Sequence, residues 1–96
     1  MKTSLSEEIN RVVESLRVLL DVSRDDLFSR KRTGNVALCR QIGMWFARKK
    51  GLKFIEIGDF FQRNHTNAMY AEKRIDELIP IDVHVQDLIR KSGALV

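Results

Sequence analysis

The sequence predicts an all-α fold, a bundle of five or six helices that contains a helix-turn-helix. Three observations favour this fold class. Apolar residues recur at helical spacing, no segment alternates apolar and polar residues for long enough to form a strand, and Pro80 is the only proline. A chain of 96 residues, 44% of them hydrophobic, fits a single domain with its own core, so we expect one domain over residues 1–96.

The first two helices carry start signals. Ser4-Leu5-Ser6-Glu7 has the form of a capping box, in which the side chain of a serine accepts a hydrogen bond from the backbone of the first turn. Ser23 is a second possible cap, and it predicts a short helix that ends at about Ser29. The apolar residues that follow the first cap at helical spacing are Leu5, Ile9, Val12, Leu16 and Leu19 or Leu20.

The third helix is expected to lie in the middle of the bundle and to be the most buried. It follows a basic loop, residues 30–34, runs over about residues 35–50, and stops at Gly51. Arg40 and Gln41 are its polar exceptions. Apolar residues occupy nearly every other face, as is typical of a helix surrounded by others: Val36, Ala37, Leu38, Cys39, Ile42, Met44, Trp45, Phe46 and Ala47.

Residues 54–78 form the predicted helix-turn-helix. A short helix over 54–61 precedes the three-residue turn Gln62-Arg63-Asn64, and a second helix, capped by Asn64, continues to about Leu78. Pro80 ends this second helix. Its inward-facing residues are expected to be Ala68, Ala71, Ile75 and Leu78.

A last helix is expected from Asp82, a candidate cap, through Lys91. Gly93 follows its end, where a glycine readily leaves the helical conformation. Its apolar side consists of Val85, Leu88 and Ile89.

Basic residues are concentrated in the middle of the chain. Residues 30–74 hold eleven basic and three acidic side chains, whereas residues 1–29 hold four and six, and residues 75–96 hold two and four. A positive middle between acidic ends is the electrostatic pattern of a protein that binds a polyanion. A solvated charged surface is the alternative explanation of the same asymmetry.

The second helix of the predicted helix-turn-helix begins with hydrogen-bonding side chains, Arg63-Asn64-His65-Thr66-Asn67. A recognition helix contacts base edges with its N-terminal residues, and a helix N-terminus favours phosphate through its free N–H groups. These residues therefore indicate a site for duplex DNA. The alternative is that Asn64 and Thr66 only cap the helix.

The sequence indicates no catalytic residue, metal site or cofactor. Cys39 is the single cysteine, so no internal disulfide can form, and two histidines distant in sequence add too few ligands for a zinc site. No nucleophile motif adjoins His65, and His84 is interpreted as a surface residue. Cys39 and Trp45 are interpreted as core residues. A Walker-type phosphate loop is absent, so we expect neither ATP hydrolysis nor any other enzyme activity.

Nothing in the sequence indicates a membrane or secreted protein. No segment approaches the roughly eighteen consecutive apolar residues of a membrane span. The polar, acidic residues 1–10 do not resemble a signal peptide. We therefore expect a cytoplasmic, nucleoid-associated protein with no small-molecule substrate.

Several segments together carry a family resemblance: Asp26-Leu27-Phe28-Ser29-Arg30-Lys31-Arg32, Val36-Ala37, Arg40-Gln41, Glu56-Ile57-Gly58-Asp59, Phe61, Arg63-Asn64-His65-Thr66, Ala71, Lys73-Arg74-Ile75 and Val85-Gln86-Asp87-Leu88-Ile89-Arg90. With them the chain resembles the C-terminal DNA-binding domain of the bacterial chromosomal replication initiator DnaA. The resemblance extends from about Ile9 to Arg90 and is most specific over residues 57–71. It implies a helix-turn-helix similar to that of the Trp repressor, with double-stranded DNA as the partner.

The resemblance also implies roles for individual residues. Arg32 matches an arginine that reads an A·T-rich minor groove. Asn64, His65 and Thr66 match the readers of base edges in the major groove. The residues that match positions in contact with the DNA backbone are Arg30, Arg40, Gln41, Phe54, Arg63, Asn67, Met69 and Arg74. Backbone contacts of this kind set the register, whereas base contacts specify the sequence.

Four departures from the family pattern bear on base preference. The family has Asp at position 64 and a second Thr at position 67, where this chain has Asn64 and Asn67. Gln62 replaces two glycines, and Gly34 replaces a basic residue. An amide carries an acceptor and two donors, so we expect the base pair facing Asn64 to shift from cytosine toward adenine or toward tolerance. The initiator's ATPase module is missing, and the acidic, Met-initiated start favours a stand-alone relative over an excised domain.

Three functions are compatible with these residues. The leading hypothesis is sequence-specific binding to a DnaA-box-like duplex site, in replication initiation or its regulation. The bound protein would mark such sites, compete for them or repress there. A transcriptional repressor with an unrelated operator is one alternative. A protein-interaction module that has lost DNA binding is the other, and the retained Arg32, Arg40, His65 and Thr66 speak against it.

Overall fold

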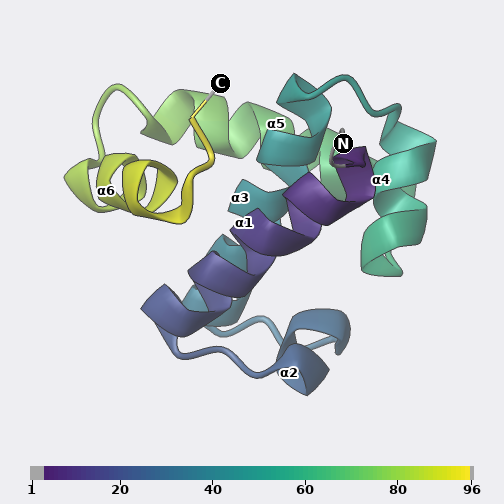
Figure 1. Ribbon diagram of the computed structural model, residues 1–96, viewed down its shortest axis with the longest axis horizontal. Coiled ribbons are helices and arrows are strands. Elements are labelled where there is room, and N and C mark those ends of the chain that lie inside the picture. The colour runs from purple at the N-terminus through teal and green to yellow at the C-terminus, as the bar shows by residue number, and fades with distance from the viewer. Residues whose placement is uncertain (1–3, 96) are drawn as a thin grey trace.

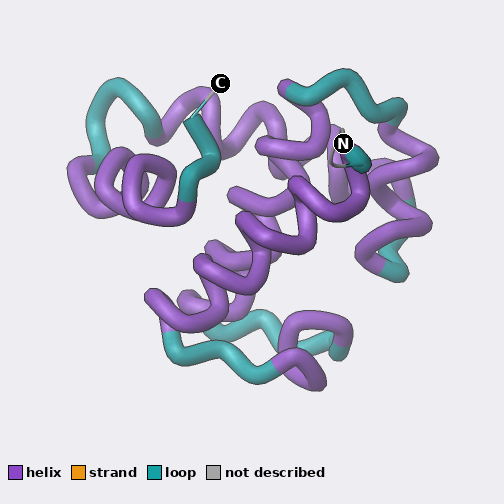
Figure 2. Tube along the Cα trace, viewed as in Figure 1, coloured by secondary structure: helices purple, strands orange, loops and turns teal. Residues whose placement is uncertain are grey.

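The computed structural model describes residues 4–95 and folds this part of the chain into six helices (Figure 1). They are α1 (Leu5–Leu20), α2 (Arg24–Phe28), α3 (Gly34–Lys49), α4 (Phe54–Phe61), α5 (His65–Leu78) and α6 (Val83–Ser92). Loops and turns join them, and no strand occurs within residues 4–95 (Figure 2). The predicted all-α fold class is therefore confirmed.

Side-chain caps set where four of these helices begin. Ser4, Ser23, Asn64 and Asp82 each accept a hydrogen bond from a backbone N–H of the first turn, at 3.2, 3.0, 3.0 and 3.1 Å. Each cap satisfies one of the N–H groups that a helix leaves without an internal partner. The four caps are those that the sequence predicts.

The bounds of α3 differ from the predicted ones by one residue at each end. Thr33 is extended and precedes the helix, so α3 begins at Gly34. Lys49 is its last residue, and Gly51 follows with φ 101°, a left-handed conformation that favours glycine. The predicted stop at Gly51 is thus confirmed.

α3 lies at the centre of the fold, in contact with α1, α2, α4 and α5, while α6 packs against α1 (Figure 1). Nine of its 16 residues are buried, more than in any other helix of the described residues. Cys39 and Trp45 are both in the core, as predicted. Within residues 4–95, no helix combines the length and the apolar character needed to cross a bilayer.

Polar contacts join α5 to α3. The indole N–H of Trp45 donates to the Asp76 carboxylate at 2.8 Å. Lys49 forms ion pairs with Asp76 at 3.2 Å and with Glu72 at 3.7 Å. Beneath them, the residues predicted to face inward are buried, except that Leu78 is half-buried: Ala68, Ala71, Ile75 and Leu78.

Candidate nucleic-acid interface

A close approach between α4 and the following turn fixes the start of α5. Gln62 takes a left-handed conformation, with φ 57°, which reverses the chain after α4. The Arg63 N–H then donates to the Gly58 carbonyl at 2.8 Å. A Cβ atom at Gly58 would lie 2.6 Å from the Arg63 carbonyl oxygen, so the turn can sit this close to α4 only because residue 58 is glycine.

The first turn of α5 is exposed and internally hydrogen-bonded. The Asn64 side-chain oxygen accepts from the Thr66 backbone N–H at 3.0 Å and from the Thr66 hydroxyl at 3.1 Å. The Asn67 amide donates to the Asn64 carbonyl at 3.4 Å. Asn64 thus caps the helix with its oxygen, which leaves its amide nitrogen as the group able to meet an acceptor on another molecule.

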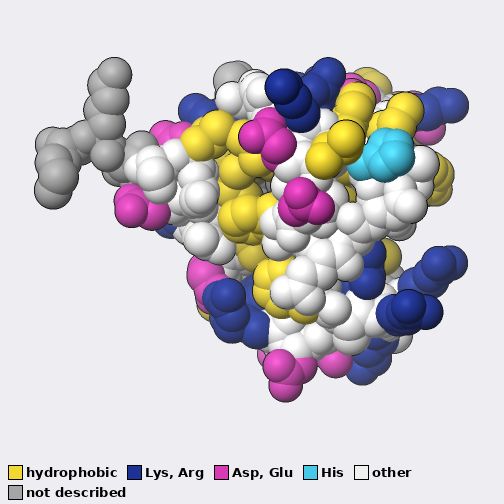
Figure 3. Space-filling view, turned by 90° about the vertical axis from the view of Figure 1, so that its right-hand side faces the viewer, with side chains coloured by type: hydrophobic (Ala, Val, Ile, Leu, Met, Phe, Trp, Pro, Cys, Tyr) yellow, Lys and Arg dark blue, Asp and Glu magenta, His cyan; other side chains and the backbone are white. Residues whose placement is uncertain are grey.

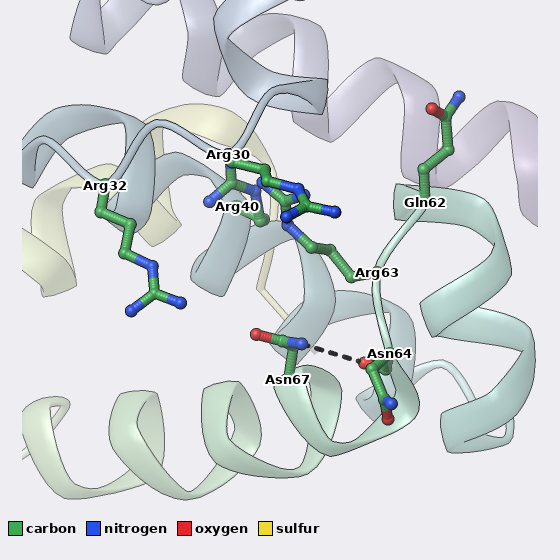
Figure 4. A pocket seen from close by; sticks show the side chains of 7 residues that line it. All are labelled: Arg30, Arg32, Arg40, Gln62, Arg63, Asn64 and Asn67. Carbon is green, nitrogen blue, oxygen red and sulfur yellow. Dashed lines mark hydrogen bonds between the residues drawn. The ribbon is translucent and has the colours of Figure 1, made fainter.

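A surface pocket of about 320 Å³ lies beside this first turn; we call it the arginine pocket. It is lined by Arg30, Arg32, Arg40, Gln62, Arg63, Asn64 and Asn67. The side chains of Arg30, Arg40 and Arg63 come together, whereas Arg32 extends to one side and Gln62 turns away (Figure 4). Among the described residues that line the pocket there is no carboxylate, so the site suits an anionic ligand.

Three segments far apart in sequence contribute these cations. Arg30 and Arg32 come from the loop between α2 and α3, Arg40 from α3, and Arg63 from the turn before α5. Burial lowers the pKa of the Arg40 guanidinium, and the charges of Arg63 and Arg32 lower it further. On the face shown in Figure 3, Lys and Arg side chains lie at the lower end, which α2 occupies in Figure 1, and also along the upper edge.

Arg40 is more deeply buried than a residue needs to be if its only role is to contact DNA. Only 8% of the residue is exposed. Its guanidinium donates to the carbonyl of Leu27 at 2.8 and 3.0 Å and to that of Ser29 at 3.1 Å. Longer hydrogen bonds reach the carbonyls of Asp26, at 3.3 Å, and Lys31, at 3.4 Å. Most of its donors are therefore directed at the end of α2 and at the loop that follows.

A second pocket of about 330 Å³ continues the arginine pocket, sharing Arg32, Arg40 and Asn67 with it. Its other lining residues are Ala37, Gln41, Met44 and Tyr70. Tyr70 is 60% exposed, and it was not among the site residues predicted from the sequence. The signal was available, because positions 66, 70 and 74 are four apart and fall on one face of a helix.

The structure brings seven of the predicted site residues together around the two pockets: Arg30, Arg32, Arg40, Gln41, Arg63, Asn64 and Asn67. His65 and Thr66 are exposed on the first turn of α5, next to Asn64. The remaining predicted residues, Phe54, Met69 and Arg74, line neither pocket.

Those three residues have different surroundings. Phe54 is half-buried at the start of α4, and the guanidinium carbon of Arg48 lies 4.1 Å from its ring centroid. Met69 and Arg74 are exposed on α5. Arg74 is thus accessible to a partner that follows the length of α5, whereas only part of Phe54 is accessible.

Comparisons with known proteins point to one family. A family model described as bacterial dnaA protein helix-turn-helix matches residues 7–75. The chain is similar to the chromosomal replication initiator protein DnaA of Thermosipho melanesiensis, with 36% identity over 70 residues, 72% of this chain and 16% of the relative. For the DnaA of Rhodopseudomonas palustris the identity is 40% over 83 residues, 84% of this chain and 17% of the relative. The DnaA of Pseudothermotoga lettingae is 34% identical over 76 residues, 78% of this chain and 17% of the relative. This chain spans about one sixth of the length of these curated relatives.

Proposed function

The chain belongs to the bacterial DnaA helix-turn-helix family, and from this membership we propose that it binds double-stranded DNA at a short asymmetric site similar to the DnaA box. The binding serves replication initiation or its regulation. The observation that carries the proposal is the arginine pocket beside the exposed first turn of α5. A cluster of guanidinium groups next to polar side chains on a helix N-terminus is suited to phosphates and base edges together.

The first turn of α5 enters the major groove. A B-DNA major groove, about 12 Å wide, admits an α-helix and presents a distinct pattern of donors and acceptors for each base pair. His65, Thr66 and the amide nitrogen of Asn64 are exposed on this turn and meet the base edges. Arg32, which extends to one side of the pocket, reaches the neighbouring minor groove, where a narrow A·T-rich tract attracts arginine (Figure 4).

The sugar–phosphate strand between those two grooves then crosses the two pockets. Arg30 and Arg63 neutralise phosphates at the first pocket, and Gln41, Asn67 and Tyr70 donate hydrogen bonds at the second. Farther along the DNA, contacts come from the exposed side chains of α5 and from the start of α4: Met69, Arg74 and Phe54.

The proposed effect of binding on the chromosome takes into account that this sequence contains no Walker-type loop. We propose that the chain does not hydrolyse ATP itself and is not an enzyme. It acts at the nucleoid by marking DnaA-box-like sites, by competing for them or by repressing there. Binding alone suffices for each of these effects.

Selection of bound sequences from a random duplex pool, at a stated salt concentration, tests the proposal. We expect one asymmetric motif with an A·T-rich end. If roughly five to eight phosphates are contacted, log affinity should fall with log salt at a slope of about −0.9 per contact. A pool without enrichment, or a flat salt response, would contradict direct binding, and an unrelated palindromic motif would favour a repressor with its own operator.

A matched pair of histidine variants locates the binding surface. His65→Ala should weaken binding to the selected motif, because it removes a side chain from the first turn of α5. His84→Ala removes an exposed histidine from α6, away from both pockets, and should bind as the wild type does. Equal losses in the two variants would place the DNA elsewhere.

A further inference from the structure

Arg40 differs from the other arginines of the arginine pocket. Arg30 and Arg32 are exposed and Arg63 is half-buried, whereas Arg40 is buried and stands on α3, the central helix. A residue that contacts DNA through its charge alone would need neither this burial nor a fixed orientation. Its surroundings therefore suggest a task within the fold.

The carbonyl that receives the shortest Arg40 hydrogen bonds, that of Leu27, is one that a short helix leaves without an internal partner. α2 has only five residues, and the last carbonyls of any helix have no partner inside it. Leu27 lies in this last turn, and Ser29 and Lys31 follow it. The other polar contacts of the loop are local. The Ser29 hydroxyl donates to the Asp26 carbonyl at 2.8 Å and accepts from the Lys31 N–H at 3.1 Å. The Ser29 N–H also donates to the Asp26 carbonyl at 3.2 Å, and the Lys31 ammonium pairs with the Asp26 carboxylate at 3.2 Å.

We propose that Arg40 is a positioning residue for minor-groove recognition: it fastens the loop of residues 29–31 to α3 and thereby presents Arg30 and Arg32 to the DNA. The task requires arginine, because its planar guanidinium carries five N–H donors that can span several carbonyls. A lysine at this position keeps the positive charge but offers its donors from a single nitrogen. The proposal rests on the proposed DNA binding, and it makes the A·T preference of Arg32 depend on a second residue that is itself buried.

The first measurement uses the free protein. Trypsin cleaves after Lys and Arg in accessible, mobile segments, so cleavage after residues 30–32 reports how firmly the loop is held. In Arg40→Lys this cleavage should be about tenfold faster, the factor expected when one or two net hydrogen bonds are lost. Val85→Ala, which opens a cavity beside α6 away from the loop, is the control for a general loss of stability. Its cleavage rate should equal that of the wild type when each protein is digested the same number of degrees below its own Tm.

The second measurement compares binding to the selected duplex with binding to one whose A·T-rich end is replaced. Arg40→Lys should lose about as much of this discrimination as Arg32→Ala, roughly tenfold, and the double variant should lose no more. Cleavage and discrimination at wild-type levels, or an equal loss of affinity for both duplexes, would overturn the proposal and leave Arg40 as a phosphate contact.

Two further outcomes are distinguishable. If the wild-type protein binds no selected duplex, the proposed function fails, while the cleavage rates still show whether Arg40 holds the loop. If Arg40→Lys does not fold, Ser29→Ala replaces it, because this variant removes the two hydrogen bonds of the Ser29 hydroxyl within the loop and leaves every charge in place. It should then speed cleavage and reduce discrimination, and unchanged discrimination would overturn the proposal.

Discussion

Replacing Gly58 by alanine should destabilise the fold, although alanine is the better helix former. The new Cβ would lie 2.6 Å from the Arg63 carbonyl oxygen, 3.1 Å from the His65 nitrogen and 3.3 Å from the Asn64 carbonyl carbon. Restoring ordinary contact at 3.4 Å requires the turn to move by about 0.8 Å. All three atoms belong to the backbone, so no side-chain rotation relieves the overlap.

Two opposing effects determine how much Gly58→Ala lowers the free energy of unfolding. Overpacking a close contact costs about 1–3 kcal/mol, and we expect the upper part of this range because the backbone must shift. The gain in helix propensity from glycine to alanine, about 1 kcal/mol, offsets part of it. The free energy of unfolding should therefore fall by about 1–2 kcal/mol, which lowers the Tm of a domain this size by about 4–8 °C per kcal/mol.

Gly34→Ala is the matched control. A Cβ at Gly34 meets nothing within 4 Å, and this glycine lies at the start of α3. Here the substitution should stabilise the protein by about 0.4–1 kcal/mol, chiefly by restricting the unfolded chain. Thermal unfolding followed by circular dichroism measures both variants, and the two shifts should have opposite signs. A Tm for Gly58→Ala at or above that of the wild type would refute the account of the α4–α5 turn.

Three further predictions concern recognition and pH. Arg32→Ala should cost about 1–3 kcal/mol of binding and relax preference at the A·T-rich end, whereas Arg74→Ala should weaken binding to all duplexes alike; identical behaviour on matched and mismatched sites would contradict this division of roles. Asn64→Asp should leave stability nearly unchanged, since the two residues cap equally well, but should move preference at one base pair toward cytosine, because the added oxygen accepts from the cytosine amino group. A selected motif unchanged at every position would reduce Asn64 to a cap. Burial raises the pKa of the Cys39 thiol to about 11, so the unfolded chain loses this proton first as pH rises. The free energy of unfolding should then decline between about pH 9 and pH 11, with about 1.4 kcal/mol per pH unit from this group. Cys39→Ala should lack this component, and the same decline in both proteins would assign it to other groups.

Local signals explain why the helices could be predicted from the sequence. A cap acts within three residues of itself, so Ser4 and Asn64 reveal their role without knowledge of the rest of the fold. The spacing of α4 and α5 is equally local, because only the three residues 62–64 separate these helices.

Non-local contacts explain what the sequence could not show. The direction of the Arg40 side chain depends on where α2 packs against α3. Its hydrogen-bond partner Leu27 is thirteen residues away in the sequence. The place of Tyr70 beside Arg32 depends on the same approach of the loop to α5. Gly58 lies in a segment that resembles the family. The reason why this position must be glycine is visible only when the turn is seen to fold back onto α4.

The arginine pocket also gives dissolved salt two opposite effects on this protein. Guanidinium groups from Arg30, Arg40 and Arg63 face one another without a carboxylate among the lining residues, so the ligand-free fold contains mutual repulsion. Counterions screen this repulsion, and added salt should therefore raise the Tm of the free protein while it weakens the complex with DNA. A polyanion such as heparin should stabilise the folded chain by mass action, because it binds the assembled pocket more tightly than the dispersed charges of the unfolded chain.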